Sequence, residues 1–123
     1  MHEMALVRNI MEVVVDEAEA AGAAEVTAVH IVVGEARDIV VDLFEGLFQF
    51  LARGTVAEHA RVIIHTVPYR VRCHGCGEEF NLDFKDRLSQ TCPRCGADRD
   101  YRLISGNELS ISKIEAIPQP RSA

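Results

Sequence analysis

The chain has 123 residues, a hydrophobic fraction of 48% and a formal net charge of -6 at pH 7. This length suits one ordinary domain with a small appendage, and the acidic excess argues against non-specific binding of nucleic acids, which needs surplus Lys and Arg. No run of about 18 uncharged apolar residues occurs, so we expect no membrane insertion. Residues 1–5 lack a basic region followed by an apolar core, so we expect no secretory signal and a cytoplasmic protein.

Three elements are predicted in the first half of the chain. Apolar residues recur at helical spacing over residues 4–21, and residues 25–35 are rich in the β-branched types that favour a strand. A second helix is predicted over residues 38–52, with Asp38 as its N-cap. The apolar stripe of this helix, which we assign to the core rather than to a binding groove, consists of Leu43, Leu47 and Leu51.

Two further strands are predicted, over residues 61–72 and 108–117. Pro68 indicates an edge, a bend or an end within the first of them. The order is therefore helix, strand, helix, strand, cysteine-rich loop, strand. The simplest compact arrangement is an α+β fold in which two helices cover one face of a three-stranded mixed sheet, with an inserted zinc-ribbon-like module that contains four cysteines.

This order implies a discontinuous main domain. We assign residues 1–70 and 103–118 to a discontinuous α/β domain and residues 71–102 to a second domain that contains the four cysteines. Residues 119–123 are expected to form a disordered tail.

The four cysteines carry the clearest chemical signal. Cys73, Cys76, Cys92 and Cys95 follow the pattern Cys-x2-Cys-x15-Cys-x2-Cys, which is typical of a zinc site. Two residues between cysteines allow a tight turn that aims both sulfurs at one tetrahedral ion. Four thiolates leave no open position, so the predicted site is structural. Paired disulfides, a redox pair and an iron site are the less favoured alternatives.

The N-terminus offers a second possible metal site. Because methionine removal requires a small second residue, His2 is expected to keep Met1 and its free amine. That amine, the His2 amide nitrogen and the His2 imidazole can chelate one Ni(II) or Cu(II) ion, and Glu3 can complete the set. From these residues alone, an ordinary exposed terminus with Glu3 at a helix start is the simpler interpretation.

The remaining candidate residues favour ordinary structural roles. His30 and His65 are interpreted as hydrogen-bonded strand residues, and His59 as a loop residue. His74 is interpreted as an exposed residue of the first cysteine turn, with an additional metal ligand as the alternative. No nucleophile set and no phosphate-binding glycine loop occur, so we do not expect an enzyme.

Five motifs, in the same order along residues 1–117, resemble the HypA/HybF family of nickel-insertion proteins. They are Met-His-Glu-Met-Ala-Leu at 1–6, Val-Gly-Glu at 33–35, Arg-Gly-Thr at 53–55, the cysteine pairs with Cys-Pro-Arg-Cys-Gly at 92–96, and Gly-Asn-Glu-Leu at 106–109. Ala36 and Arg37 replace the expected Leu-Ser, and Asn107 stands where Arg is common. These departures leave the candidate metal ligands intact.

The resemblance implies a two-domain metallochaperone for [NiFe]-hydrogenase maturation. Nickel would be bound at the N-terminus by His2, assisted by the Met1 amine and by Glu3, and zinc would be bound by the four cysteines. The implied partners are a nickel-handling GTPase (HypB) and the large subunit of the hydrogenase. The alternative function is a zinc-ribbon adaptor that binds proteins and transfers no nickel.

Overall fold

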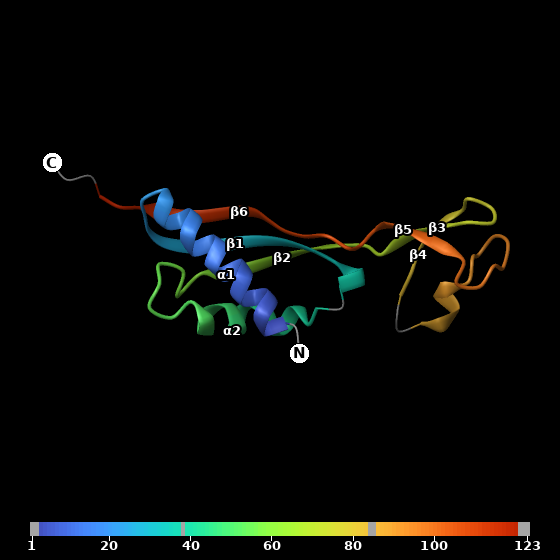
Figure 1. Cartoon of the computed structure of the whole chain (residues 1–123), viewed down its shortest axis with the longest axis horizontal. Coiled ribbons are helices and arrows are strands. Elements are labelled where there is room, and N and C mark those ends of the chain that lie inside the picture. Colours follow the sequence, from blue (N-terminus) through green and yellow to red (C-terminus); the bar gives the residue numbers. More distant parts are fainter. Residues whose placement is uncertain (1–2, 38, 84–85, 121–123) are drawn as a thin grey trace. The chain divides into compact units, whose positions relative to one another are not determined.

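The computed structural model describes residues 3–37, 39–83 and 86–120. Its contacts divide the chain into two compact units (Figure 1). The first unit contains Met1–Val32, Ile39–His65 and Ser110–Ala123, and the second contains Val33–Asp38 and Thr66–Leu109. None of the helices within the described ranges is long and apolar enough to cross a membrane.

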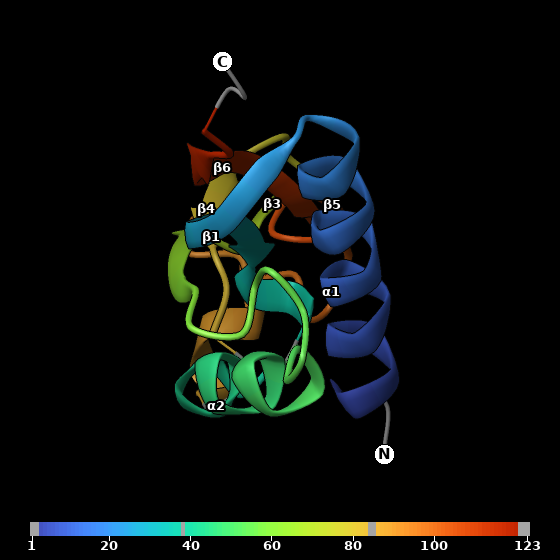
Figure 2. The ribbon, with the colours of Figure 1, turned by 90° about the vertical axis from the view of Figure 1, so that its left-hand side faces the viewer.

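The first unit is built on a three-stranded sheet with the order β2-β1-β6. Its strands are β1 (Ala23–Gly34), β2 (Arg61–Val67) and β6 (Leu109–Pro118). Figure 1 shows β2 running parallel to β1 and β6 running antiparallel to it. The helices α1 (Glu3–Ala20) and α2 (Val41–Leu51) lie on one face of the sheet (Figure 2). The predicted α+β fold class is therefore confirmed.

Helix α1 forms because apolar side chains return to one face every three or four residues. The residues that this face buries are Val7, Ile10, Met11, Val14 and Ala18. The chain turns at Gly22, whose φ angle of 72° is easily adopted only by glycine, and enters β1. Val26, Val29 and Ile31 of β1 are completely buried.

Helix α2 begins at Val41, and its N-cap is Val40, which makes no capping hydrogen bond through its side chain. The predicted start at Asp38 was therefore wrong, although Asp38 itself lies outside the described residues. The assignment of the leucine stripe to the core was wrong for Leu43, whereas Leu47 and Leu51 are half-buried. Phe44 and Phe48 are the buried residues of α2, whereas Leu43 is 56% exposed.

The second unit contains its own small antiparallel sheet, with the order β4-β3-β5. Its strands are β3 (Arg70–Cys73), β4 (Glu79–Asn81) and β5 (Tyr101–Ser105). The strand predicted over residues 61–72 is thus two strands in different sheets, because the chain breaks at Pro68, which has no N–H to donate. Short 3-10 helices occupy Glu35–Arg37 and Arg87–Gln90.

Two glycines bring separate segments of the second unit into very close contact. A Cβ atom on Gly34 would lie 1.9 Å from the carbonyl oxygen of Gly106, and one on Gly106 would lie 2.7 Å from the Cα atom of Tyr69. The Ala36 N–H donates to the Gly106 oxygen over 2.7 Å. Only glycine fits at positions 34 and 106 without moving the backbone.

Candidate metal centre

Two turns of the same backbone geometry present the four cysteines. The Gly77 N–H donates to the Cys73 oxygen, and the Gly96 N–H donates to the Cys92 oxygen, each over 3.0 Å. Both glycines have positive φ angles, 79° at Gly77 and 77° at Gly96. An L-residue at either position would be strained, so each glycine permits its turn to close under the sulfurs.

The sheet and a short bridge fix the start of each turn. Cys73 is the last residue of β3, and its N–H donates to the Glu78 oxygen over 2.9 Å. Cys92 follows Thr91, which forms an isolated antiparallel bridge with Asp98. Cys73 and Cys92 are 2% and 3% exposed, so the first cysteine of each pair is anchored inside the second unit. Cys76 is half-buried and Cys95 is exposed.

The four sulfurs converge on one point. All four Sγ atoms lie within 4.8 Å of one another. The Cys73–Cys95 and Cys76–Cys92 sulfur distances are 3.6 Å and 3.5 Å. Sulfurs bound at about 2.3 Å to one tetrahedral ion are separated by about 3.8 Å, whereas a disulfide bond is about 2.05 Å long. The cluster therefore has the dimensions of a tetrahedral thiolate metal site and not those of two disulfides.

The four sulfurs influence one another's pKa values in opposite directions. The N–H groups of Cys95 and Arg94 donate to the Cys92 sulfur and, against burial, lower its pKa to about 6. At Cys76 a backbone hydrogen bond involving Glu78 lowers the pKa, but burial and hydrogen bonds with the other three thiols outweigh it and raise the pKa to about 12. Four neighbouring thiolates repel one another unless a cation neutralises them, so the donor set suits a divalent metal such as zinc.

His74 lies in the first turn but faces another residue. Its Nδ1 atom is 2.8 Å from Oδ1 of Asp100, and both side chains are more than half exposed. Among the described residues, the only cluster suited to a metal ion consists of the four cysteines. The structure thus gives His74 a carboxylate partner and does not place it in the sulfur cluster.

The structure does not describe most of the candidate nickel site. Met1 and His2 lie outside the described residues, so their assignment as nickel ligands stays a prediction. Glu3 is the first residue of α1 and is half-buried. A carboxylate at this position interacts favourably with the helix dipole, whether or not a metal is bound.

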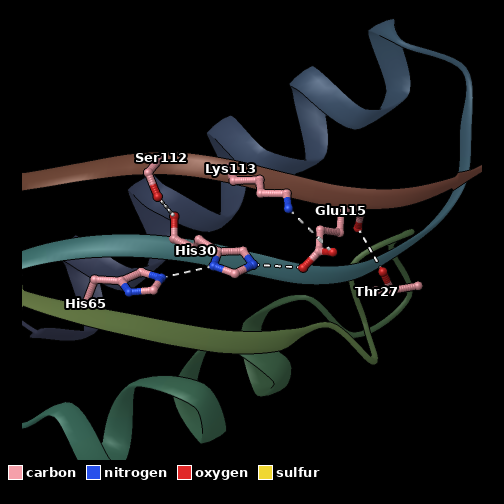
Figure 3. A network of polar contacts seen from close by, with 6 residues as sticks. All are labelled: Thr27, His30, His65, Ser112, Lys113 and Glu115. Carbon is pink, nitrogen blue, oxygen red and sulfur yellow. Dashed lines mark hydrogen bonds and ion pairs between the residues drawn. The ribbon is translucent and has the colours of Figure 1, made fainter.

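The other two candidate histidines belong to a network on the side of the first sheet away from α1 (Figure 3). His30 Nε2 lies 2.7 Å from Oε2 of Glu115, and His30 Nδ1 lies 3.0 Å from Nε2 of His65. The imidazole planes differ by 10° and their centroids are 5.3 Å apart. That separation equals the nitrogen–nitrogen contact plus two ring radii, so the rings lie end to end, as Figure 3 shows.

The fold and the sulfur cluster define a small α+β protein whose four-cysteine site can hold a metal ion. A family model described as "Hydrogenase/urease nickel incorporation, metallochaperone, hypA" matches residues 1–116. The chain belongs to the HypA family of nickel-incorporation metallochaperones for hydrogenase maturation. The resemblance noted in the sequence motifs is therefore confirmed, and the family is one of metallochaperones rather than enzymes.

Similar proteins agree with this assignment along nearly the full chain. Hydrogenase maturation factor HypA of Geobacter metallireducens is 35% identical over 94% of this chain and 98% of its own length. The protein of the same name from Streptomyces avermitilis is 38% identical over 93% of this chain and 86% of its own length. The solution structure of the Ni metallochaperone HypA from Helicobacter pylori shares the fold, with a TM-score of 0.63 at 20% identity over 97% of this chain and 100% of that one.

One cluster of charged residues in the second unit was not predicted from the sequence. Arg70, Arg72 and Arg102 share a face of the small sheet, because Arg72 lies opposite Arg102 and Arg70 is two residues from Arg72 on the same strand. The Arg-Val-Arg alternation at 70–72 was the available signal, since alternate strand residues point to the same side.

Proposed function

We propose that this protein is a nickel metallochaperone that binds Ni(II) at its N-terminus and delivers it during maturation of [NiFe]-hydrogenase. The observation that supports this most strongly is the family match over residues 1–116, which begins at the candidate nickel ligands. The relatives named above are hydrogenase maturation factors, and a neighbour in structure is named a Ni metallochaperone.

The proposed nickel ligands are groups of Met1, His2 and Glu3. A terminal amine, a backbone amide nitrogen and an imidazole form adjacent small chelate rings around one ion, and nitrogen donors of this kind suit Ni(II). The proposal requires a free amine on Met1. Such a site exposes one side of the ion, and an exposed ion can pass to a competing set of ligands. Transfer of cargo therefore needs no covalent chemistry from this chain.

We assign Zn(II) to Cys73, Cys76, Cys92 and Cys95 as a permanent structural ion. Four thiolates saturate a tetrahedral zinc ion, which then cross-links β3 to the loop that contains the second turn. The second unit has few fully buried apolar side chains, so the ion supplies folding energy that burial cannot. The two metals are separated by ligand type, with sulfur for zinc and nitrogen for nickel.

The proposed partners are the nickel-handling GTPase HypB and the large subunit of the hydrogenase. The family's role in nickel incorporation supports partners of this kind, because cargo must be received and passed on. We propose the cytoplasm as the site of action, since the four thiols must stay reduced to bind zinc. Nucleic acids and membranes have no part in this proposal.

Delivery is tested in cells whose own gene for this protein has been deleted. Complementation with the wild-type chain should restore [NiFe]-hydrogenase activity at limiting nickel. His2→Ala should fail at limiting nickel and recover when nickel is in excess. His59→Ala is a matched control, because the His59 side chain is 77% exposed and its one ionic contact within the described chain is with the neighbouring Glu58. Full complementation by His2→Ala would contradict delivery of nickel from the N-terminus. It would favour the alternative function, a zinc-ribbon adaptor that binds proteins and transfers no nickel.

A further inference from the structure

The strand register of the second unit places several charged side chains on one face of its sheet. In β3–β4, Arg72 lies opposite Glu79 and Arg70 lies opposite Asn81. In β3–β5, Arg72 also lies opposite Arg102. Residues directly opposite in an antiparallel pair share a face. We call Arg70, Arg72, Arg102, Glu79 and Asn81 the arginine face.

The opposite face of this sheet is occupied by apolar packing. Val71 and Cys73, which alternate with the arginines on β3, are 0% and 2% exposed. Phe80 and Tyr101 meet edge to face, with ring centroids 6.3 Å apart. The sheet therefore uses one side for its small core and its cysteine turn, and presents the arginine side outward.

Two of the three guanidinium groups on this face share one carboxylate, that of Glu79. Arg72 Nη2 donates to Glu79 Oε2 over 2.6 Å, and Arg70 Nη2 lies 3.9 Å from Glu79 Oε1. The Arg70 Nη1 atom donates to the Asn81 side-chain oxygen over 2.8 Å. The hydrogen bond from Arg72 and the nearby charges, including that of Arg102, hold the pKa of Glu79 below its ordinary value. All three arginines are therefore close to Glu79.

The local charge is left unbalanced. Within the described chain, Arg102 has no ion pair or hydrogen bond through its side chain, and the buried Nε of Arg72 has no acceptor. Like charges directly opposite on a sheet are destabilising, as at Arg72 and Arg102. The side chains of Arg70, Arg72 and Glu79 are 41%, 43% and 39% exposed. An external anion can reach this face and would relieve the repulsion.

We propose that the arginine face is a docking surface for an acidic, carboxylate-bearing segment of a partner protein. A guanidinium group presents paired donors that match a carboxylate, and Arg72 donates one hydrogen bond, from Nη2, to Glu79. The surface is a local excess of positive charge on a chain whose formal net charge is -6. The overall charge repels a long polyanion, whereas a short acidic segment meets only this face.

Nucleic acid fits the same face less well. Proteins that bind single strands interleave positive side chains with aromatic rings on which bases stack. The aromatic side chains of this sheet, Phe80 and Tyr101, lie on its other side. The arginine face therefore offers charge without stacking platforms, which favours carboxylates on a peptide.

The test uses the full-length, zinc-loaded protein and a fluorescein-labelled peptide of six glutamates. Binding is followed by fluorescence anisotropy at low ionic strength, and amide shifts in a ¹⁵N spectrum locate the contact. We expect the peptide to shift amides of β3 and β5 and to bind about tenfold more weakly to Arg102→Glu. Arg61→Glu changes the net charge equally in the first unit, and it should change binding by no more than about twofold.

Zinc content and circular dichroism of both variants establish that the second unit remains folded. Absence of binding, or equal weakening by Arg102→Glu and Arg61→Glu, would overturn the proposal. Tighter binding of an oligonucleotide of equal charge on the same amides would also overturn it and would identify a phosphate-binding face. The result of this binding experiment does not depend on the nickel proposal, because neither variant alters a proposed metal ligand.

Discussion

His30 Nε2 and Glu115 Oε2 lie 2.7 Å apart and join two strands whose contacting residues are 85 positions apart in sequence. His65 extends this contact to the third strand, so one chain of polar side chains crosses β2, β1 and β6 (Figure 3). The Ser112 hydroxyl donates to the His30 backbone oxygen over 3.3 Å. These contacts connect the three strands on the side of the sheet opposite α1.

The contact predicts a pH-dependent contribution to stability. The hydrogen bond from His30, and then the charge of Lys113, lower the pKa of Glu115. A carboxyl group whose pKa is lower in the folded state stabilises the fold above its unfolded-state pKa of about 4.3, and this contribution disappears as pH falls through the folded-state pKa. Glu115→Gln should therefore lower the Tm at pH 6, and the difference from wild type should vanish in strong acid.

Thermal melts of both proteins between pH 3 and pH 7 measure this effect. Glu12→Gln on the exposed side of α1 is the matched control and should leave the curve unchanged. A constant difference between wild type and Glu115→Gln at every pH would show that the carboxylate charge is not responsible.

Loss of zinc should unfold the second unit selectively. Cys73→Ser removes one of four converging sulfurs, and the remaining three cannot saturate a tetrahedral ion. Zinc per chain should fall from near one toward zero, and amide protection should be lost in β3, β4 and β5 but retained in α1 and β1. Metal analysis with hydrogen exchange measures both.

His74→Ala is the control for that experiment, because His74 pairs with Asp100 outside the sulfur cluster. It should retain its zinc and its exchange protection. Equal zinc loss in the two variants would show that His74 is a ligand, contrary to the structure.

The close contact at Gly34 predicts a large effect from one methyl group. In Gly34→Ala the new Cβ would lie 1.9 Å from the Gly106 oxygen, so the backbone must move, at a cost of about 1–3 kcal/mol or more. Gly46→Ala is the matched control on α2, where a Cβ meets nothing within 4 Å. It should stabilise the helix by about 0.5–1 kcal/mol. Urea unfolding of both variants measures the free energy of unfolding, which should fall in Gly34→Ala and rise in Gly46→Ala.

The buried and exposed faces of α2 should respond differently to truncation of a side chain to alanine. Phe48 is completely buried, and Phe48→Ala should lower the free energy of unfolding by about 3–5 kcal/mol. Leu43 is 56% exposed, and Leu43→Ala should change it by no more than about 0.5 kcal/mol. Chemical denaturation provides both values, and a large loss in Leu43→Ala would restore the sequence-based assignment of Leu43 to the core.

That assignment failed for a physical reason. Helical periodicity locates an apolar face only when the other faces are polar. Helix α2 carries apolar residues over most of its circumference, so periodicity predicted the helix but could not select Phe44 and Phe48 over Leu43. The choice depends on which side meets the sheet, and this is a tertiary property.

The cysteine cluster could be predicted because its geometry is local. Two short turns place the sulfurs, and their spacing is visible in the sequence. The arginine face depends on the pairing of β3 with β4 and β5, which no local pattern encodes. The break at Pro68 was indicated, but alternation continues on both sides of it, so two separate sheets could not be inferred.

The predicted domain boundaries and the assigned metal ligands remain predictions. Val33–Asp38 belongs to the second unit, together with residues 66–109. This association joins segments far apart in the sequence, so the composition of the chain does not reveal it. The nickel ligands were inferred from a chemical motif at the N-terminus, and its first two residues lie outside the described structure.

The most direct test of the nickel proposal is a calorimetric titration of Ni(II) into protein with a native N-terminus and into the same protein with its Met1 amine acetylated. The proposal predicts tight binding to the native form, weakening as pH falls below the amine pKa of about 7.7–8.0, and its loss in the acetylated form, with zinc content unchanged. Equal nickel affinity in the two forms would contradict it.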